Sequence, residues 1–134
     1  MERVGPTTSE FDDRYRVIGA PAMRRAERRV IGSDYGATSY TTRTQADQLA
    51  VMLRLEPGRL LLDVGTGAGW PGVYLADTTG CDIVLADLPF EGLKAASLRM
   101  EGVGVAGGIV NATGESLPFR DGMFDAVTSS DVFC

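Results

Sequence analysis

The segment Leu60–Asp77, LLLDVGTGAGWPGVYLAD, constrains the fold most, because a short apolar run leads directly into closely spaced glycines. Residues 59–64 (RLLLDV) are almost continuously apolar and lie between Gly58 and Gly65, a pattern typical of a strand buried on both faces. The glycines allow a tight turn into a helix, whose first amides can approach a ligand. The segment therefore predicts a strand, a ligand-binding turn and a helix.

The same alternation continues to the end of the chain. Further strands are predicted at 81–87 (CDIVLAD), 103–111 (VGVAGGIVN) and about 124–129, and a helix over 90–100. Repeated strand–helix–strand units imply an α/β fold with a parallel sheet.

An N-terminal helical arm is predicted ahead of these units. It contains a short helix or loose arm at 11–18, a helix over 21–31 that begins with proline, and a stronger helix over 41–55. With 134 residues, 44% hydrophobic and 23% charged, the chain is expected to form one domain over 1–134, with 1–57 as the arm or cap.

Composition narrows the possible functions. A net charge of −5 argues against a nucleic-acid partner, and the absence of histidine removes the commonest general base and most zinc sites, so no metal is expected. No apolar run approaches the ~20 residues that cross a membrane. Cys81 and Cys134 lack a Cys-x-x-Cys partner, which favours reduced thiols in a cytoplasmic protein.

The glycines can be read in two registers. From Gly67, GAGWPG is a G-x-G-x-x-G dinucleotide fingerprint, but this register places Asp63 inside the strand, facing a pyrophosphate of the same charge. From Gly65, the loop is G-x-G-x-G, and Asp63 lies near the carboxyl end of the strand. An acid there suits a ligand with a positive charge, such as an ammonium or a sulfonium, so we favour the Gly65 register.

A second acid supports nucleoside binding. Asp87 ends the second predicted strand, 22 residues after Gly65, where a carboxylate can accept both ribose hydroxyls. Leu88 then lies where it can contact a base. The alternative role for Asp87 is a helix N-cap ahead of Pro89.

Three motifs in order, LLLDVGTGAG, VLADLP and GESLPFRDGMFDAV, resemble the class I S-adenosylmethionine-dependent methyltransferases, particularly the small-molecule branch. The resemblance covers about residues 38–134. It implies a Rossmann-like three-layer sandwich with a partial parallel sheet of about four strands and N-terminal cap helices. S-adenosylmethionine would bind at the carboxyl ends of the strands.

The resemblance also implies a set of cofactor-binding residues. By position, Asp63, Gly65 and Gly67 hold the methionine part, together with Thr66 and Gly69 of the same loop. Asp87 holds the ribose, with Leu88 beside it. Thr113, Gly114 and Glu115 flank the adenine, and Ser129 and Ser130 lie near the cofactor. Tyr40, Thr42 and Gln45 close over the methionine carboxylate, or else serve in helix capping.

The chain departs from the family pattern at two places. Thr113 stands where the family usually has an acid, so Thr113, Asn111 or a backbone carbonyl would have to accept the adenine amino group. The sequence stops at Cys134, where the fourth strand finishes, which suggests a truncated chain. A homodimer or a partner chain is then expected to cover the edge of that strand.

The expected function is methyl transfer from S-adenosylmethionine to a small-molecule acceptor, with this chain supplying the cofactor-binding half. Glu115 and Asp131 are the available carboxylates, but neither is a convincing base and no catalytic residue is named. Two alternatives stay open: a non-catalytic Rossmann-like module that binds a partner subunit, and a fragment of a nicotinamide-dependent oxidoreductase.

Overall fold

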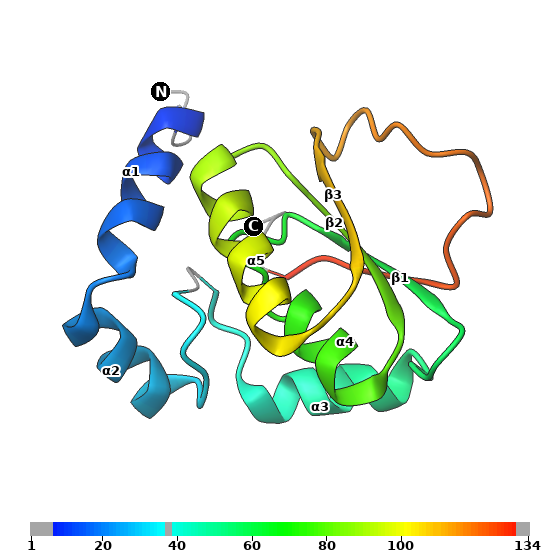
Figure 1. Cartoon of the computed structure of the whole chain (residues 1–134), viewed down its shortest axis with the longest axis horizontal. Coiled ribbons are helices and arrows are strands. Elements are labelled where there is room, and N and C mark those ends of the chain that lie inside the picture. The colour runs from blue at the N-terminus through cyan, green and yellow to red at the C-terminus, as the bar shows by residue number, and fades with distance from the viewer. Residues whose placement is uncertain (1–6, 37–38, 131–134) are drawn as a thin grey trace, which may run out of the picture.

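Four parallel strands form one sheet in the order β3-β2-β1-β4 (Figure 1). The computed structural model describes residues 7–36 and 39–130. Its elements are α1 (Thr8–Ile18), α2 (Pro21–Val30), α3 (Arg43–Met52), β1 (Leu60–Val64), α4 (Gly72–Thr79), β2 (Asp82–Asp87), α5 (Phe90–Val103), β3 (Gly107–Asn111) and β4 (Ala126–Thr128).

The strand order contains a reversal beside β1. The chain moves outward from β1 through β2 to β3, and then returns to place β4 on the other side of β1. In open parallel sheets, ligands bind outside the carboxyl ends of the strands at such a reversal. The topology therefore predicts a ligand site at the carboxyl ends of β1, β2 and β4. The parallel sheet with its helices also confirms the prediction of a Rossmann-like α/β fold.

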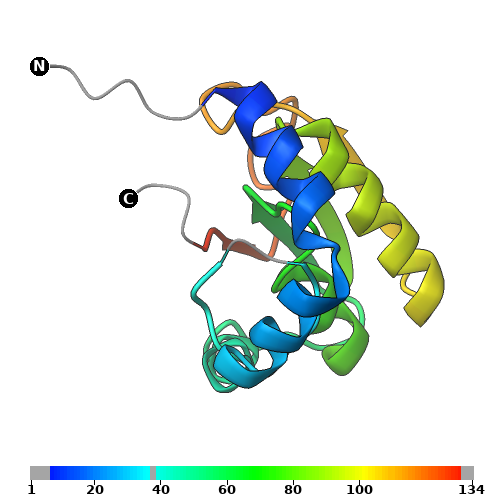
Figure 2. The same cartoon turned by 90° about the vertical axis from the view of Figure 1, so that its left-hand side faces the viewer.

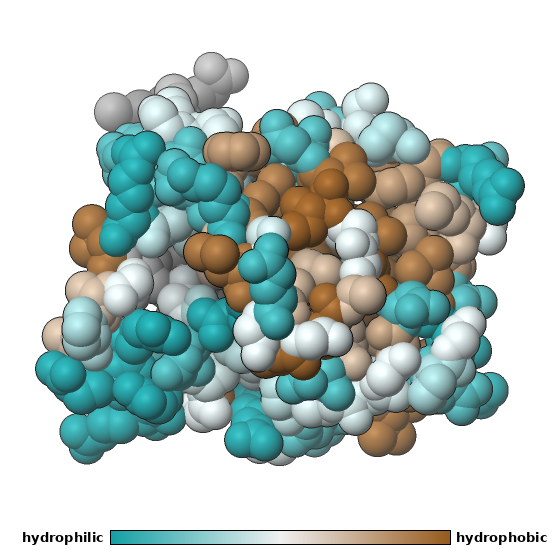
Figure 3. All heavy atoms as spheres, in the orientation of Figure 1, coloured by the Kyte–Doolittle hydropathy of each residue, from teal (hydrophilic) through white to brown (hydrophobic). Residues whose placement is uncertain are grey.

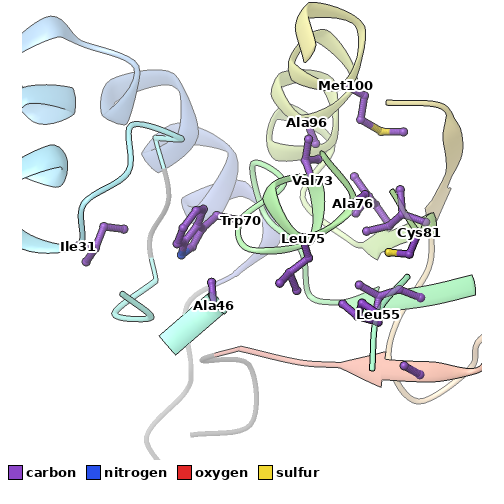
Figure 4. Close-up of a cluster of buried hydrophobic side chains, with 14 residues drawn as sticks. Ile31, Ala46, Leu55, Trp70, Val73, Leu75, Ala76, Cys81, Ala96 and Met100 are labelled. Carbon is purple, nitrogen blue, oxygen red and sulfur yellow. The ribbon is translucent and has the colours of Figure 1, made fainter. Parts of the chain in front are cut away.

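Helices α3, α4 and α5 cover one face of the sheet and form the main core with it. The fully buried side chains Leu61, Ile83 and Leu85 point from the strands toward Leu75 of α4. In Figure 4, Trp70 lies among these core side chains, between Ile31 and the residues of α4.

The opposite face of the sheet is covered by the segment 112–125, which contains no helix. Leu62 and Val64 alternate with the residues of the other face and pack against Leu117, Phe119 and Phe124 from this segment. The rings of Phe119 and Phe124 meet edge to face with their centroids 4.9 Å apart. This small second cluster fixes the segment that follows β3.

Helix α1 of the N-terminal arm lies beside α5, as Figure 2 shows. Helix α2 has no buried residue, and the hydrophilic surface over it is plain in Figure 3. Glu27 anchors this helix, since its carboxylate accepts the amide hydrogens of Tyr35 and Gly36, both at 2.7 Å. Helix α2 is therefore held by polar contacts more than by apolar burial.

Several predicted boundaries differ from the structure. The strand expected over 103–111 begins only at Gly107, because α5 continues to Val103 and ends at Gly104, whose φ of 72° caps the helix. The helix expected to reach residue 55 ends at Met52, and Arg54 takes a φ of 53°. Residues 8–18 form a regular helix, which resolves the alternative of a loose arm.

Two general properties of the described residues bear on function. In the part of the chain that the structure describes, no helix has the length and apolar character to cross a membrane. Within residues 7–36 and 39–130, no three acidic or cysteine side chains cluster closely enough to share a metal ion. Asp131 and Cys134 lie outside the described residues.

Candidate ligand-binding site

The glycine-rich turn begins at Gly65, as the favoured register predicts. Strand β1 ends at Val64, and positive φ values of 71°, 56° and 95° follow at Gly65, Gly67 and Gly69. The amides of Gly65 and Thr66 both donate to the carbonyl oxygen of Ala86 in β2, at 2.7 and 3.3 Å. The turn is thereby tied to the neighbouring strand at the sheet edge.

Asp63 holds this turn from inside. Its Oδ2 accepts hydrogen bonds from the Thr66 hydroxyl at 2.7 Å and from the Gly72 amide at 3.1 Å. Burial raises the pKa of Asp63 to about 7, and the nearby Asp87 charge acts in the same direction. Its Oδ1 is buried without a hydrogen-bond partner within residues 7–36 and 39–130. Oδ1 therefore keeps its full capacity to accept a hydrogen bond.

Asp87 lies at the carboxyl end of β2 and is bound to the turn. Its Oδ2 accepts the Gly67 amide hydrogen at 2.7 Å, and its Oδ1 accepts that of Leu88 at 2.8 Å. Burial raises the pKa of this half-buried carboxyl above its usual range. The N-cap alternative is wrong, since Pro89 occupies the N-cap position of α5 and no side chain caps it. Each oxygen keeps capacity to accept a hydroxyl.

Asn111, at the end of β3, fixes the backbone beside Asp87. Its Nδ2 donates to the carbonyl oxygens of Asp87 at 3.1 Å and Leu88 at 2.7 Å. The sequence suggested Asn111 only as an acceptor for an adenine, and this bracing role was missed. No sequence signal could have revealed it, because it depends on the strand register that pairs Asp87 with Asn111.

The remaining predicted residues lie on turns around the same sheet edge. Thr113 Oγ1 accepts the Glu115 amide at 3.2 Å, so its hydroxyl shapes a turn on which Gly114 and Glu115 are exposed. Ser129 is exposed and Ser130 half-buried, directly after β4. Because the strands are parallel, these turns share one edge with the glycine turn.

The cap segment contacts the glycine turn through its backbone. Trp70 Nε1 donates to the Thr41 carbonyl oxygen at 2.9 Å. Thr42 and Gln45 form a capping box for α3. The backbone amide of Gln45 donates to Thr42 Oγ1 at 3.2 Å, and the backbone amide of Thr42 donates to Gln45 Oε1 at 2.8 Å. Tyr40 is 84% exposed. The structure therefore shows the capping role for Thr42 and Gln45.

This chain is similar to known proteins in sequence and in structure. A family model described as a methyltransferase domain matches residues 62–134. Squalene methyltransferase 1 of Botryococcus braunii is 33% identical over 89 residues, 65% of this chain and 24% of that protein. Sarcosine/dimethylglycine N-methyltransferase of Halorhodospira halochloris is 33% identical over 93 residues, 68% of this chain and 33% of that protein. The chain thus spans a third or less of the length of these relatives.

Solved structures share the fold. A methyltransferase from Thiobacillus denitrificans, in complex with S-adenosylhomocysteine, has a TM-score of 0.55 and 27% identity over 66% of this chain and 36% of that one. One from Aquifex aeolicus has a TM-score of 0.62 at 17% identity, over 88% of this chain and 55% of that one. Since the family model also covers more than half of the sequence, this chain belongs to the class I S-adenosylmethionine-dependent methyltransferases.

Proposed function

We propose that this chain binds S-adenosylmethionine at the carboxyl ends of β1, β2 and β4, as the cofactor-binding part of a methyltransferase. The observation that carries the proposal is the 2.7 Å hydrogen bond between the Gly67 amide and Asp87. It joins the glycine turn to the acid of β2 at the reversal of strand order, where a nucleoside ligand is expected.

The residues at this edge fit the chemical groups of the cofactor. Asp87 offers two half-buried carboxylate oxygens to a ribose diol, and the exposed Leu88 lies beside it as an apolar surface for a base. Thr113, Gly114 and Glu115 are proposed to flank the adenine. A hydroxyl at Thr113 is a weaker acceptor than a carboxylate, by about 1 kcal/mol.

The methionine end is assigned to the glycine turn. Gly65 is the partly exposed residue of that turn, while Thr66, Gly67 and Gly69 are buried behind it. The buried Oδ1 of Asp63 suits a cationic group, and Ser130 follows β4 on the same edge. We retain the proposal that the segment carrying Tyr40, Thr42 and Gln45 closes over the methionine carboxylate, since Trp70 holds it against the turn.

The proposed mechanism depends on positioning. When bound, the cofactor supplies an electrophilic methyl group on a sulfonium. This chain's residues would fix the ribose through Asp87, orient the methionine part on Gly65 and exclude water from the edge of the sheet. Glu115 is exposed on its turn and is given no role in proton transfer.

The acceptor is proposed to be a small molecule. The named relatives act on squalene and on sarcosine or dimethylglycine, and these names support the same class for this chain. A net charge of −5 is unfavourable for a nucleic-acid acceptor.

We also propose that the free edge of β4 pairs with a strand from a second copy or a partner chain. Within the described sheet β4 pairs with β1 alone, and Val127 is 55% exposed. Light scattering during size-exclusion chromatography tests this: a stable, soluble monomer contradicts it.

The test of cofactor binding is isothermal titration of the chain with S-adenosylhomocysteine, with NAD in parallel. We expect saturable binding of S-adenosylhomocysteine alone, a loss of most of it in Asp87→Ala, and no change in Asp121→Ala, which alters an exposed acid on a turn. Binding of NAD alone would support the oxidoreductase alternative. Failure of the folded chain to bind either ligand contradicts the proposal.

A further inference from the structure

Tyr15 of α1 lies directly on the middle glycine of the turn. Its hydroxyl occupies the space that a side chain at Gly67 would need, and its Cζ is 3.2 Å from that Cβ position. The same ring lies against α5, with Cε2 3.0 Å from the Cβ position of Gly92. Two glycines that are distant in sequence thus make room for one aromatic ring from the N-terminal arm.

This contact completes the enclosure of Gly67. The amide of Gly67 is bound to Asp87, its carbonyl oxygen lies 3.0 Å from the Cβ position of Gly92, and Tyr15 covers its Cα. In the related G-x-G-x-x-G turn of dinucleotide-binding proteins, the second glycine allows the ligand to approach the backbone closely, and Gly67 is the second glycine of this turn. A ligand cannot reach this side of Gly67 while Tyr15 is in place.

We propose that α1 is a lid over the cofactor site, and that Tyr15 has to leave Gly67 before the ligand settles on the turn. The inference rests on the proposed function, because it takes the turn to be where S-adenosylmethionine binds. Tyr15 is then the residue through which the N-terminal arm sets the rate of ligand entry.

The attachment of α1 is weak enough for a lid. None of the α1 side chains that the structure describes is buried. The Glu91 amide donates to Asp12 Oδ1 at 3.0 Å, and Arg16, whose side chain is 59% exposed, pairs with Glu91 at 3.6 Å. Exposed ion pairs of this kind contribute little to stability. A cavity of about 310 Å³, lined by Ala68, Leu98 and Tyr15 among others, also remains beside the ring.

The helix is built to move as a unit. Thr7 and Glu10 form a capping box at its start, so α1 carries its own end stabilisation when it leaves α5. A two-residue connection, Gly19–Ala20, joins it to α2, and Gly19 is exposed, with the Arg16 carbonyl oxygen 4.0 Å from its Cβ position. Helix α2 stays anchored through Glu27, which makes the connection the natural hinge.

The kinetic test compares Tyr15→Ala with Val17→Ala in stopped-flow binding of S-adenosylhomocysteine to the full chain. Val17 is 64% exposed on the same helix and serves as the matched control. We expect Tyr15→Ala to raise the association rate constant about fivefold or more, since a competing closed state is removed, and Val17→Ala to leave it unchanged. An unchanged rate, or weaker binding, in Tyr15→Ala overturns the lid.

A ligand-free test uses thermal unfolding of Gly67→Ala in the wild-type and Tyr15→Ala backgrounds. We expect the fall in Tm to be smaller without Tyr15, because the added methyl then has space; an equal fall contradicts the contact. If Gly67→Ala does not fold, Gly92→Ala replaces it in the same cycle. The two failures are distinguishable: if the proposed function is wrong, neither wild type nor Tyr15→Ala binds S-adenosylhomocysteine.

Discussion

The first amide of α4, on Gly72, donates its hydrogen to the buried carboxylate of Asp63 at 3.1 Å. A Cβ at Gly72 would lie 2.9 Å from the Cβ of Asp63 and closer still to its carboxylate. The close approach of helix and strand therefore depends on the missing side chain. Asp63 thus joins strand β1 to the start of helix α4 through a hydrogen bond across the turn.

Gly72→Ala is expected to destabilise the chain by about 1–3 kcal/mol, because the new methyl forces the Asp63 carboxylate out of its place. Urea denaturation measures the free energy of unfolding. Gly102→Ala in α5 is the matched control, since nothing lies near its Cβ position, and we expect it to be neutral or to stabilise by about 0.5–1 kcal/mol. Equal effects of the two substitutions would contradict this account.

The stability of the chain is expected to fall as the pH rises through the range in which Asp63 ionises. Burial raises the pKa of this group from 3.8 to about 7 in the folded chain. Between roughly pH 4 and pH 7 the folded chain therefore holds a proton that the unfolded chain has released, so a rising pH favours unfolding. Asp63→Asn should flatten this part of the curve in urea denaturation. A slope identical to that of the wild type would refute the assignment.

Loss of the amide of Asn111 is expected to weaken binding at Asp87 without contact to the ligand. Asn111→Asp keeps the shape of the side chain but removes the donor to the carbonyl oxygens of Asp87 and Leu88. We expect a loss of about 1 kcal/mol in stability and about tenfold weaker binding of S-adenosylhomocysteine. Calorimetric titration measures the second effect. Ser116→Ala, on the exposed turn that follows, should change neither quantity.

Glu27→Ala is expected to release the segment between α2 and α3. Its carboxylate accepts the amides of Tyr35 and Gly36 and the Ser33 hydroxyl, the last at 3.1 Å. Removing an acceptor for partly buried donors costs about 1–3 kcal/mol. Hydrogen exchange should show faster exchange at the amides of Tyr35 and Gly36. Glu56→Ala, at an exposed position, is the control. Equal exchange rates at these two amides in both variants would contradict the proposed role of Glu27.

The order of the elements could be predicted because it is encoded locally. The apolar run LLLDV and the glycines after it specify β1 and its turn, and the structure places both at these residues. The boundary near Val103 could not be predicted, since Val-Gly-Val fits both the start of a strand and a helix that ends on a left-handed glycine. Only packing in the folded chain distinguishes the two.

The candidate site likewise has residues that the sequence predicts and contacts that it does not. Asp63, Gly65 and Asp87 stand at fixed spacings within one strand–helix–strand unit, so the sequence is enough to predict that they lie at one edge. The contact of Tyr15 with Gly67 and the bracing by Asn111 join separate elements. Such contacts follow no periodicity and arise only when helices and strands pack.

The environment of Trp70 gives the chain an intrinsic optical reporter. Trp70 is the only tryptophan of the sequence, is 3% exposed, and follows the glycine turn directly. Its ring centroid lies 5.0 Å from that of Tyr35 and 5.2 Å from that of Tyr74, and its indole nitrogen donates to the cap segment. A rearrangement of the segment around Tyr35, of the cap segment or of the turn changes the surroundings of this one fluorophore. Its emission therefore reports on the site without an added label.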